Sequence, residues 1–209
     1  MIVRAILTLS FFINVSLNFN LSAQGTKGQT VESGSRDKYS KLWNRVDSLE
    51  QKGLNRSALE LSVEIFKTAK AENNSSMLVK AMIYRLKFQN FVEEDALLKN
   101  IHDLEAETKS GKFPERLLLH SMLGEIYWRY YQQNRYRFLD RTETVGIDEA
   151  NPATWDLKKI VRESLSHYSK SLEQSDESKA TTIKTFEEII IQVDSLGSRK
   201  LRPTLFDFL

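Results

Sequence analysis

Turn-forming residues are scarce throughout this chain, and that scarcity limits the folds open to it. The 209 residues include only eight glycines and three prolines. A β-sandwich or a loop-rich scaffold needs such residues about every ten positions. The chain is 41% hydrophobic and 28% charged, as globular proteins are, and it is long enough to bury a sizeable core. The composition therefore favours helices joined by few turns.

Charge and cysteine content exclude several classes of function. The formal net charge is +2, which provides no general attraction to nucleic acid or to anionic lipid. Cysteine is absent, so the chain has no disulfide framework, thiol nucleophile or thiolate metal site. The core alone must then stabilise the fold.

The N-terminus predicts export. Arg4 precedes a short apolar run, and Ala23 is a small residue suited to a cleavage site. We expect residues 1–23 to be a secretory signal peptide, in preference to a membrane anchor or a first core element. Asparagine and serine residues interrupt the apolar run, which is too short to span a bilayer. The polar residues 24–37 then predict a flexible linker, and the location is the periplasm or cell envelope.

From residue 38 onward the apolar residues recur with a helical period. Gly53 predicts a left-handed helix stop followed by Leu54, and Asn55 is a candidate cap for the next helix. Acidic residues 93–95 precede another predicted helix, where they favour the helix dipole. The expected inward stripes are Leu42, Val46 and Leu49; Ala58, Leu61, Ile65, Phe66 and Ala69; Leu78, Met82, Ile83 and Leu86; Leu97, Ile101, Leu104 and Thr108, ending at Gly111; Leu118, Met122, Ile126 and Tyr130, after Pro114; and Leu157, Val161, Leu165, Tyr168 and Leu172, in a helix from about Thr154. A seventh helix is expected over 182–193, and Pro203 opens a last segment.

Short helices with short connections predict antiparallel hairpins. Two fragments are similar to tetratricopeptide repeats: Leu123-Gly124-x-x-Tyr127, with His120 where Trp is usual, and Ser62-x-x-x-Phe66-x-x-Ala69. They do not recur at a 34-residue period. We therefore predict an all-α fold, an irregular tetratricopeptide-like array of helical hairpins over 38–209.

No catalytic, cofactor-binding or metal site is predicted. His102, His120 and His167 lie on three different predicted helices without metal-ligand spacing. We expect His102 and His167 to face solvent and His120 to lie at a boundary. The acidic residues 93–95 and 187–188 are interpreted as a helix start and a solvated face, and the glycines form no phosphate-binding loop. The chain is therefore not expected to be an enzyme.

Aromatic residues and arginines are concentrated in residues 127–142. As a nucleic-acid surface, the arginines would contact phosphates and the aromatic rings would stack on bases. As part of the fold, Tyr127, Tyr130 and Tyr131 continue the inward stripe, and Trp128 lies against a neighbouring helix. The arginines then pair with Asp140, Glu143 or helix-end carbonyls. The balanced charge and the predicted export favour the second interpretation, and no nucleic-acid partner is expected.

This same stretch carries a family resemblance. Residues 130–138, Arg141-Thr142 and residues 154–157 resemble the N-terminal region of large bacterial alpha-2-macroglobulin-family proteins of the Bacteroidota type. Supporting similarities are Lys52-Gly53-Leu54, Ser57-Ala58-Leu59, Leu78-Val79-Lys80-Ala81, Glu93-Glu94-Asp95 and residues 201–209. The resemblance covers about residues 39–209.

The resemblance implies a helical leader that precedes β-sandwich macroglobulin domains in a family of endopeptidase inhibitors. Some members trap proteases through a Cys-Gly-Glu-Gln thioester, which this chain lacks, so no functional residues carry over. The expected role is structural or docking, with the downstream domains or another envelope protein as partner and no membrane span after signal cleavage. The apolar helix start after Pro203 suggests truncation at the C-terminus. The alternative is a free-standing periplasmic helical-repeat scaffold that binds a protein or peptide.

Overall fold

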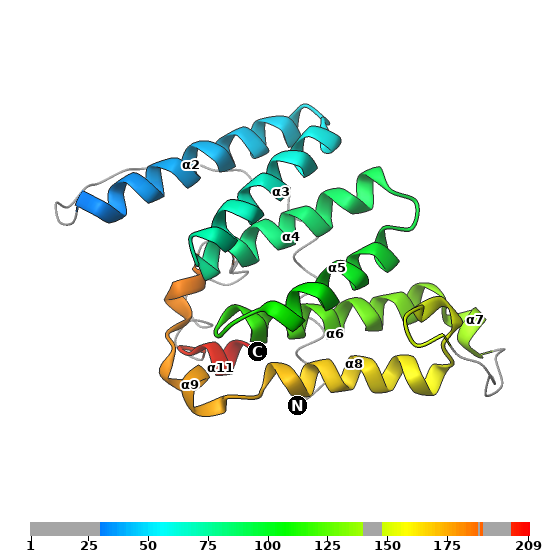
Figure 1. Cartoon of the computed structure of the whole chain (residues 1–209). Coiled ribbons are helices and arrows are strands. Elements are labelled where there is room, and N and C mark those ends of the chain that lie inside the picture. Colours follow the sequence, from blue (N-terminus) through cyan, green and yellow to red (C-terminus); the bar gives the residue numbers. More distant parts are fainter. Residues whose placement is uncertain (1–29, 140–147, 188, 190–201) are drawn as a thin grey trace. The chain divides into compact units, whose positions relative to one another are not determined.

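The computed structural model describes residues 30–139, 148–187, 189 and 202–209. The described residues are mainly helical and form no β-strand, so the predicted all-α fold is confirmed (Figure 1). The chain divides into two compact units after Val92. The predicted signal peptide lies outside the described residues.

The first unit consists of α2 (Thr30–Gln51), α3 (Asn55–Ala71) and α4 (Ser75–Val92). Residues 30–37, predicted as linker, belong to α2. The predicted stop at Gly53 is confirmed: its φ is +70°, and the Leu54 amide donates to the Leu49 carbonyl in a Schellman arrangement. The predicted cap at Asn55 is wrong, because Asn55 is the first helical residue and the preceding residue makes no side-chain cap.

The core of this unit follows the predicted stripes of α3 and α4. On α2 only Val46 of the predicted stripe is buried, and Leu42 and Leu49 are half-buried. The five residues expected to face inward on α3 are all buried, and on α4 only Ile83 is half-buried instead of buried. Trp43 of α2 packs its ring 4.8 Å from that of Tyr84 on α4. The Lys87 ammonium on α4 lies 2.5 Å from the Glu50 carboxylate on α2. Along these two contacts the residue numbers rise in the same direction on both helices, so α2 and α4 are parallel. The helix between them in the chain, α3, is antiparallel to both (Figure 1).

The second unit has three principal helices, α5 (Ala96–Ser110), α6 (Glu115–Gln133) and α8 (Leu157–Ser171), with α6 in contact with both others (Figure 1). The predicted stops and starts at Gly111 and Pro114 match the end of α5 and the start of α6. All four residues of the predicted α6 stripe are buried; on α5 Leu97 is only half-buried. The shorter elements are α7 (Arg135–Leu139), η2 (Pro152–Thr154), α9 (Ser175–Ala180), η3 (Ile183–Phe186) and α11 (Leu205–Phe208).

Two predicted boundaries differ from the structure. The helix expected from Thr154 begins at Leu157, because Asp156 accepts a hydrogen bond from the Lys159 amide and caps it there. After α8 the short helix α9 forms in a polar stretch where no helix is predicted. Of the helix expected over 182–193, residues 183–186 form the 3₁₀ turn η3, and residues 188 and 190–193 lie outside the described residues.

The last described segment is fixed onto α9 and η3. The Leu205 amide donates to the Thr181 carbonyl, and the Ile183 amide donates to the Pro203 carbonyl. Thr204 and Asp207 form a capping box, so the helix start predicted after Pro203 is present. None of the described helices is long and apolar enough to cross a membrane.

Candidate functional site

The contact between α6 and α8 brings together the chemically richest side chains of the second unit. At its centre a Cβ on Gly124 would lie only 3.1 Å from the Ser164 carbonyl oxygen on α8. The Ser164 hydroxyl donates a 2.8 Å hydrogen bond to the Gly124 carbonyl. Glycine and serine thus allow the two helix backbones to approach closely, and two rows of polar and aromatic side chains flank this point.

Two histidines meet on one side of the contact. His120 Nδ1 on α6 and His167 Nδ1 on α8 are 2.9 Å apart, so one ring donates a hydrogen bond to the other. His167 is buried, which contradicts the prediction that it faces solvent. His120 is half-buried, as expected of a boundary residue, and the His102 side chain on α5 is exposed as predicted.

The surroundings of this histidine pair keep both rings neutral at neutral pH. Burial, followed by the positive charges of Lys170 and Arg116, lowers the pKa of His120 to about 4. Burial, followed by the charge that His120 would carry and then Lys170, lowers the pKa of His167 to about 4. A general base works best with a pKa near the operating pH, so these rings are poorly suited to acid–base catalysis at pH 7.

Tyr127 extends the same cluster towards the start of α8. Its ring stacks with the rings of His167 and Trp155, whose centroids are 5.6 and 5.5 Å away. Its hydroxyl donates to Glu105 of α5. Burial, followed by this bond and the charge of Glu105, raises the Tyr127 pKa above its usual value. The cluster therefore connects α5, α6 and α8 through one buried tyrosine.

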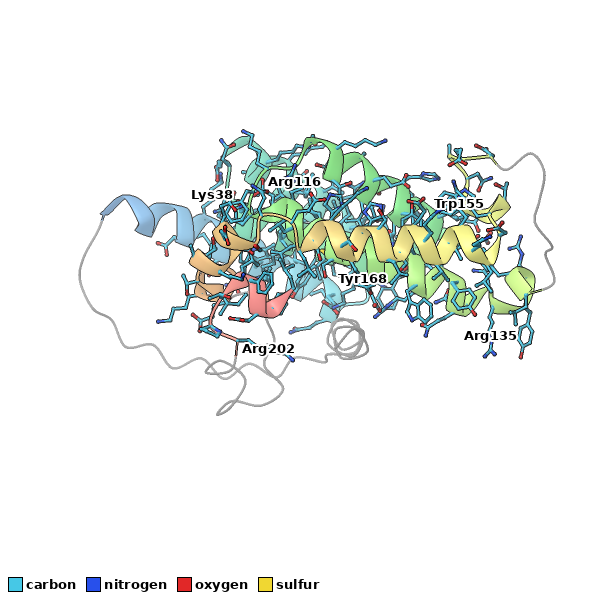
Figure 2. All side chains as sticks on the ribbon, turned by 90° about the horizontal axis from the view of Figure 1, so that it is seen from below. Lys38, Arg116, Arg135, Trp155, Tyr168 and Arg202 are labelled. Atoms are coloured by element: carbon cyan, nitrogen blue, oxygen red, sulfur yellow. The ribbon has the colours of Figure 1, made fainter. Side chains whose placement is uncertain are left out.

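A second polar network lies on the other side of the α6–α8 contact. Glu125 is buried and accepts hydrogen bonds from Arg129 Nε at 2.8 Å and from the Tyr168 hydroxyl at 2.9 Å. Burial, followed by the Glu125 charge and hydrogen bond, raises the Tyr168 pKa above its usual value. In Figure 2, Tyr168 and Trp155 lie on opposite sides of α8.

The apolar stripe predicted for α8 does not face the core. The buried residues of α8 are instead Lys159, Ile160, Ser164, His167 and Ser171. Leu165 and Leu172 are exposed, while Leu157, Val161 and Tyr168 are half-buried. The prediction is wrong because the close approach at Gly124 selects small and polar side chains for the contact. The apolar stripe is consequently displaced to one flank of α8.

The aromatic and arginine stretch divides between core and surface. Tyr127 and Tyr130 are buried, as the fold interpretation predicts, whereas Trp128 and Tyr131 are half-buried. On α7, Phe138 is buried and Arg135 and Tyr136 are exposed. Arg129 pairs with Glu125, while the predicted acidic partners Asp140 and Glu143 lie outside the described residues.

Of the other acidic candidates, the structure describes residues 93–95 and 187. Glu93 pairs with Lys99, and Glu188 lies outside the described residues. Within the described part of the chain, no group of three or more histidine, aspartate or glutamate side chains could hold a metal ion. The pairing of His120 with His167 could not be found from the sequence, because 47 residues separate the two and no motif spacing relates them.

Comparisons with known proteins leave the family open. No protein-family model matches the chain, and neither the curated proteins nor the solved structures include a match. The resemblance to the alpha-2-macroglobulin leader therefore stays a prediction from the sequence.

Proposed function

We propose that this chain is an exported, non-catalytic docking domain, the helical leader of an alpha-2-macroglobulin-like envelope protein. One observation carries the docking role. In the second unit the ionisable side chains hold helices together, whereas apolar side chains of α7 and α8 remain exposed. A domain whose polar chemistry is used internally and whose helix flanks stay apolar is suited to binding another protein.

The packing of the first unit supports a repeat-like scaffold. Trp43 Nε1 donates to the Met77 sulfur, 34 residues further along the chain, and Lys38 pairs with Glu72 at the same separation. Parallel packing of α2 and α4 around an antiparallel α3 is how stacked helical hairpins bury a continuous core. This arrangement supports the tetratricopeptide-like part of the proposal.

The histidine pair supports a non-catalytic role. Both rings have pKa values of about 4, and each Nδ1 atom takes part in the bond between them. Protease inhibition in the proposed whole protein would then reside in macroglobulin domains downstream, with the leader packing against them.

A second candidate is a free-standing periplasmic scaffold that binds a protein or peptide. The exposed apolar flank of α8 favours it, because such a flank is available to a partner from another chain.

The genomic reading frame beyond the codon for Leu209 tests the leader proposal. We expect the frame to continue into β-rich domains. A stop codon directly after Leu209, with no macroglobulin-like gene adjacent, would refute the leader role and leave the free-standing scaffold.

A further inference from the structure

Apolar and aromatic side chains on α6, α7 and α8 of the second unit are exposed or half-buried. On α8 the apolar residues follow one another at intervals of 4, 4, 3 and 4 residues from Leu157 to Leu172. Such spacing is typical of the row of side chains that one helix packs against another, and we call the row from Leu157 to Leu172 the α8 seam. At a rise of 1.5 Å per residue the α8 seam is about 22 Å long. Leu165, near its middle, is 48% exposed.

The α8 seam is joined to the aromatic end of α6. Tyr168, a member of the seam, hydrogen-bonds to Glu125 on α6. Trp128 lies three residues after Glu125 on α6. The Trp128 ring centroid is 5.2 Å from that of Tyr131. Tyr131 in turn lies 5.9 Å from Phe138 of α7, where Tyr136 is 83% exposed. In Figure 2, Tyr168 and Arg135 lie on the same side of α8. The aromatic side chains thus continue the seam towards α7.

Positive charge borders this surface. Residues 128–139 contain three arginines and no acidic residue. Arg135 and Arg137 of α7 are exposed, and so is Arg162 beside the seam on α8. Glu125, the acidic residue that accepts from Tyr168, is already paired with Arg129. Exposed arginines beside apolar and aromatic side chains favour a partner that is apolar on one face and acidic at its margins.

We infer that the surface formed by Trp128, Tyr131, Tyr136, Leu157, Val161 and Leu165 binds an amphipathic helix with acidic margins, an inference that rests on the proposed docking function. The leucines and valine take the apolar face of the partner helix. Arg135, Arg137 and Arg162 attract its carboxylates. A helix is favoured over a lipid surface because the apolar residues of α8 have the spacing with which one helix packs against another.

A designed peptide tests the inference with the whole chain. The probe is a fluorescent peptide of about 20 residues, with leucines at helical spacing and glutamates elsewhere, titrated by anisotropy at low and physiological salt. We expect binding that weakens as salt rises. A matched peptide with lysines in place of the glutamates should bind at least about tenfold more weakly, because the arginine border repels it.

Two variants locate the binding surface. Leu165→Asp should weaken binding of the acidic peptide by about tenfold or more, since it places a carboxylate in the seam. Leu54→Asp is the matched control, because Leu54 is 49% exposed but lies in the first unit, and it should leave binding unchanged. The double variant Arg135→Glu, Arg137→Glu should weaken binding and reduce its salt dependence. Circular dichroism confirms that each variant keeps its helices.

Other outcomes would overturn the inference. Equal binding of the acidic and lysine peptides, or equal effects of Leu165→Asp and Leu54→Asp, would refute it. If the chain binds no peptide but binds phosphatidylglycerol vesicles, and Leu165→Asp abolishes the vesicle binding, the surface is assigned to a membrane instead. Dimerisation lost in Leu165→Asp would assign it to a second copy. A reading frame that continues into macroglobulin domains, with no peptide binding, would refute this surface and leave the leader proposal intact.

Discussion

The histidine pair between α6 and α8 should make the second unit sensitive to acid. An unfolded histidine titrates near 6.5, whereas His120 and His167 titrate at about 4 in the folded chain. A lowered folded pKa means that the neutral rings stabilise the fold fully above pH 6.5, and that this contribution is lost as the pH falls towards 4. Replacing both residues by glutamine removes it.

The magnitude follows from the two pKa values. A pH of about 5 lies about 1.5 units below the pKa of an unfolded histidine, which is then protonated, while the folded ring is still neutral. Each histidine therefore lowers the free energy of unfolding at about pH 5 by about 2 kcal/mol relative to about pH 7.5. His120 is half-buried, so solvent screening reduces its share, and we expect about 2–4 kcal/mol for the pair. That is a large fraction of the stability of a small domain.

Urea unfolding followed by circular dichroism measures this effect at about pH 7.5 and about pH 5. Carboxylates elsewhere also titrate, so the relevant quantity is the difference between the wild type and the double variant His120→Gln, His167→Gln. The wild type should lose about 2–4 kcal/mol more than the double variant between the two pH values. His102→Gln, which removes an exposed imidazole on α5, should behave as the wild type does. If the wild type and the double variant lose equal stability, the histidine pair is not the acid-sensitive element.

Three further substitutions test the packing through the free energy of unfolding. Gly124→Ala should destabilise by about 1–3 kcal/mol, because its Cβ would approach the Ser164 carbonyl and the Tyr168 ring; a neutral result would mean that α6 and α8 can separate freely. Gly53→Ala should cost about 1 kcal/mol from its positive φ alone, since its Cβ would meet open space, and a stabilised variant would contradict the Schellman assignment. Ser164→Ala should cost about 1 kcal/mol by removing a buried hydrogen bond, and unchanged stability would show that this bond contributes nothing.

Local signals determined most of the first unit. A helical period of apolar residues needs no distant information, because the side that carries them is buried in whatever partner the helix finds. The α3 stripe from Ala58 to Ala69 is buried for this reason. A glycine with positive φ ends a helix through its own backbone geometry, so the stop at Gly53 could also be predicted.

Only the tertiary structure decided which face of α8 is buried. Apolarity favoured the stripe through Leu165, but α6 approaches α8 so closely at Gly124 that Ser164 and its neighbours fit the contact better. The same approach places His120 against His167, a pairing between residues 47 positions apart that no local pattern encodes. The sequence by itself therefore determined that the chain folds into helices and where most of them lie. The distance between two helix backbones decided which side chains became core and which became surface.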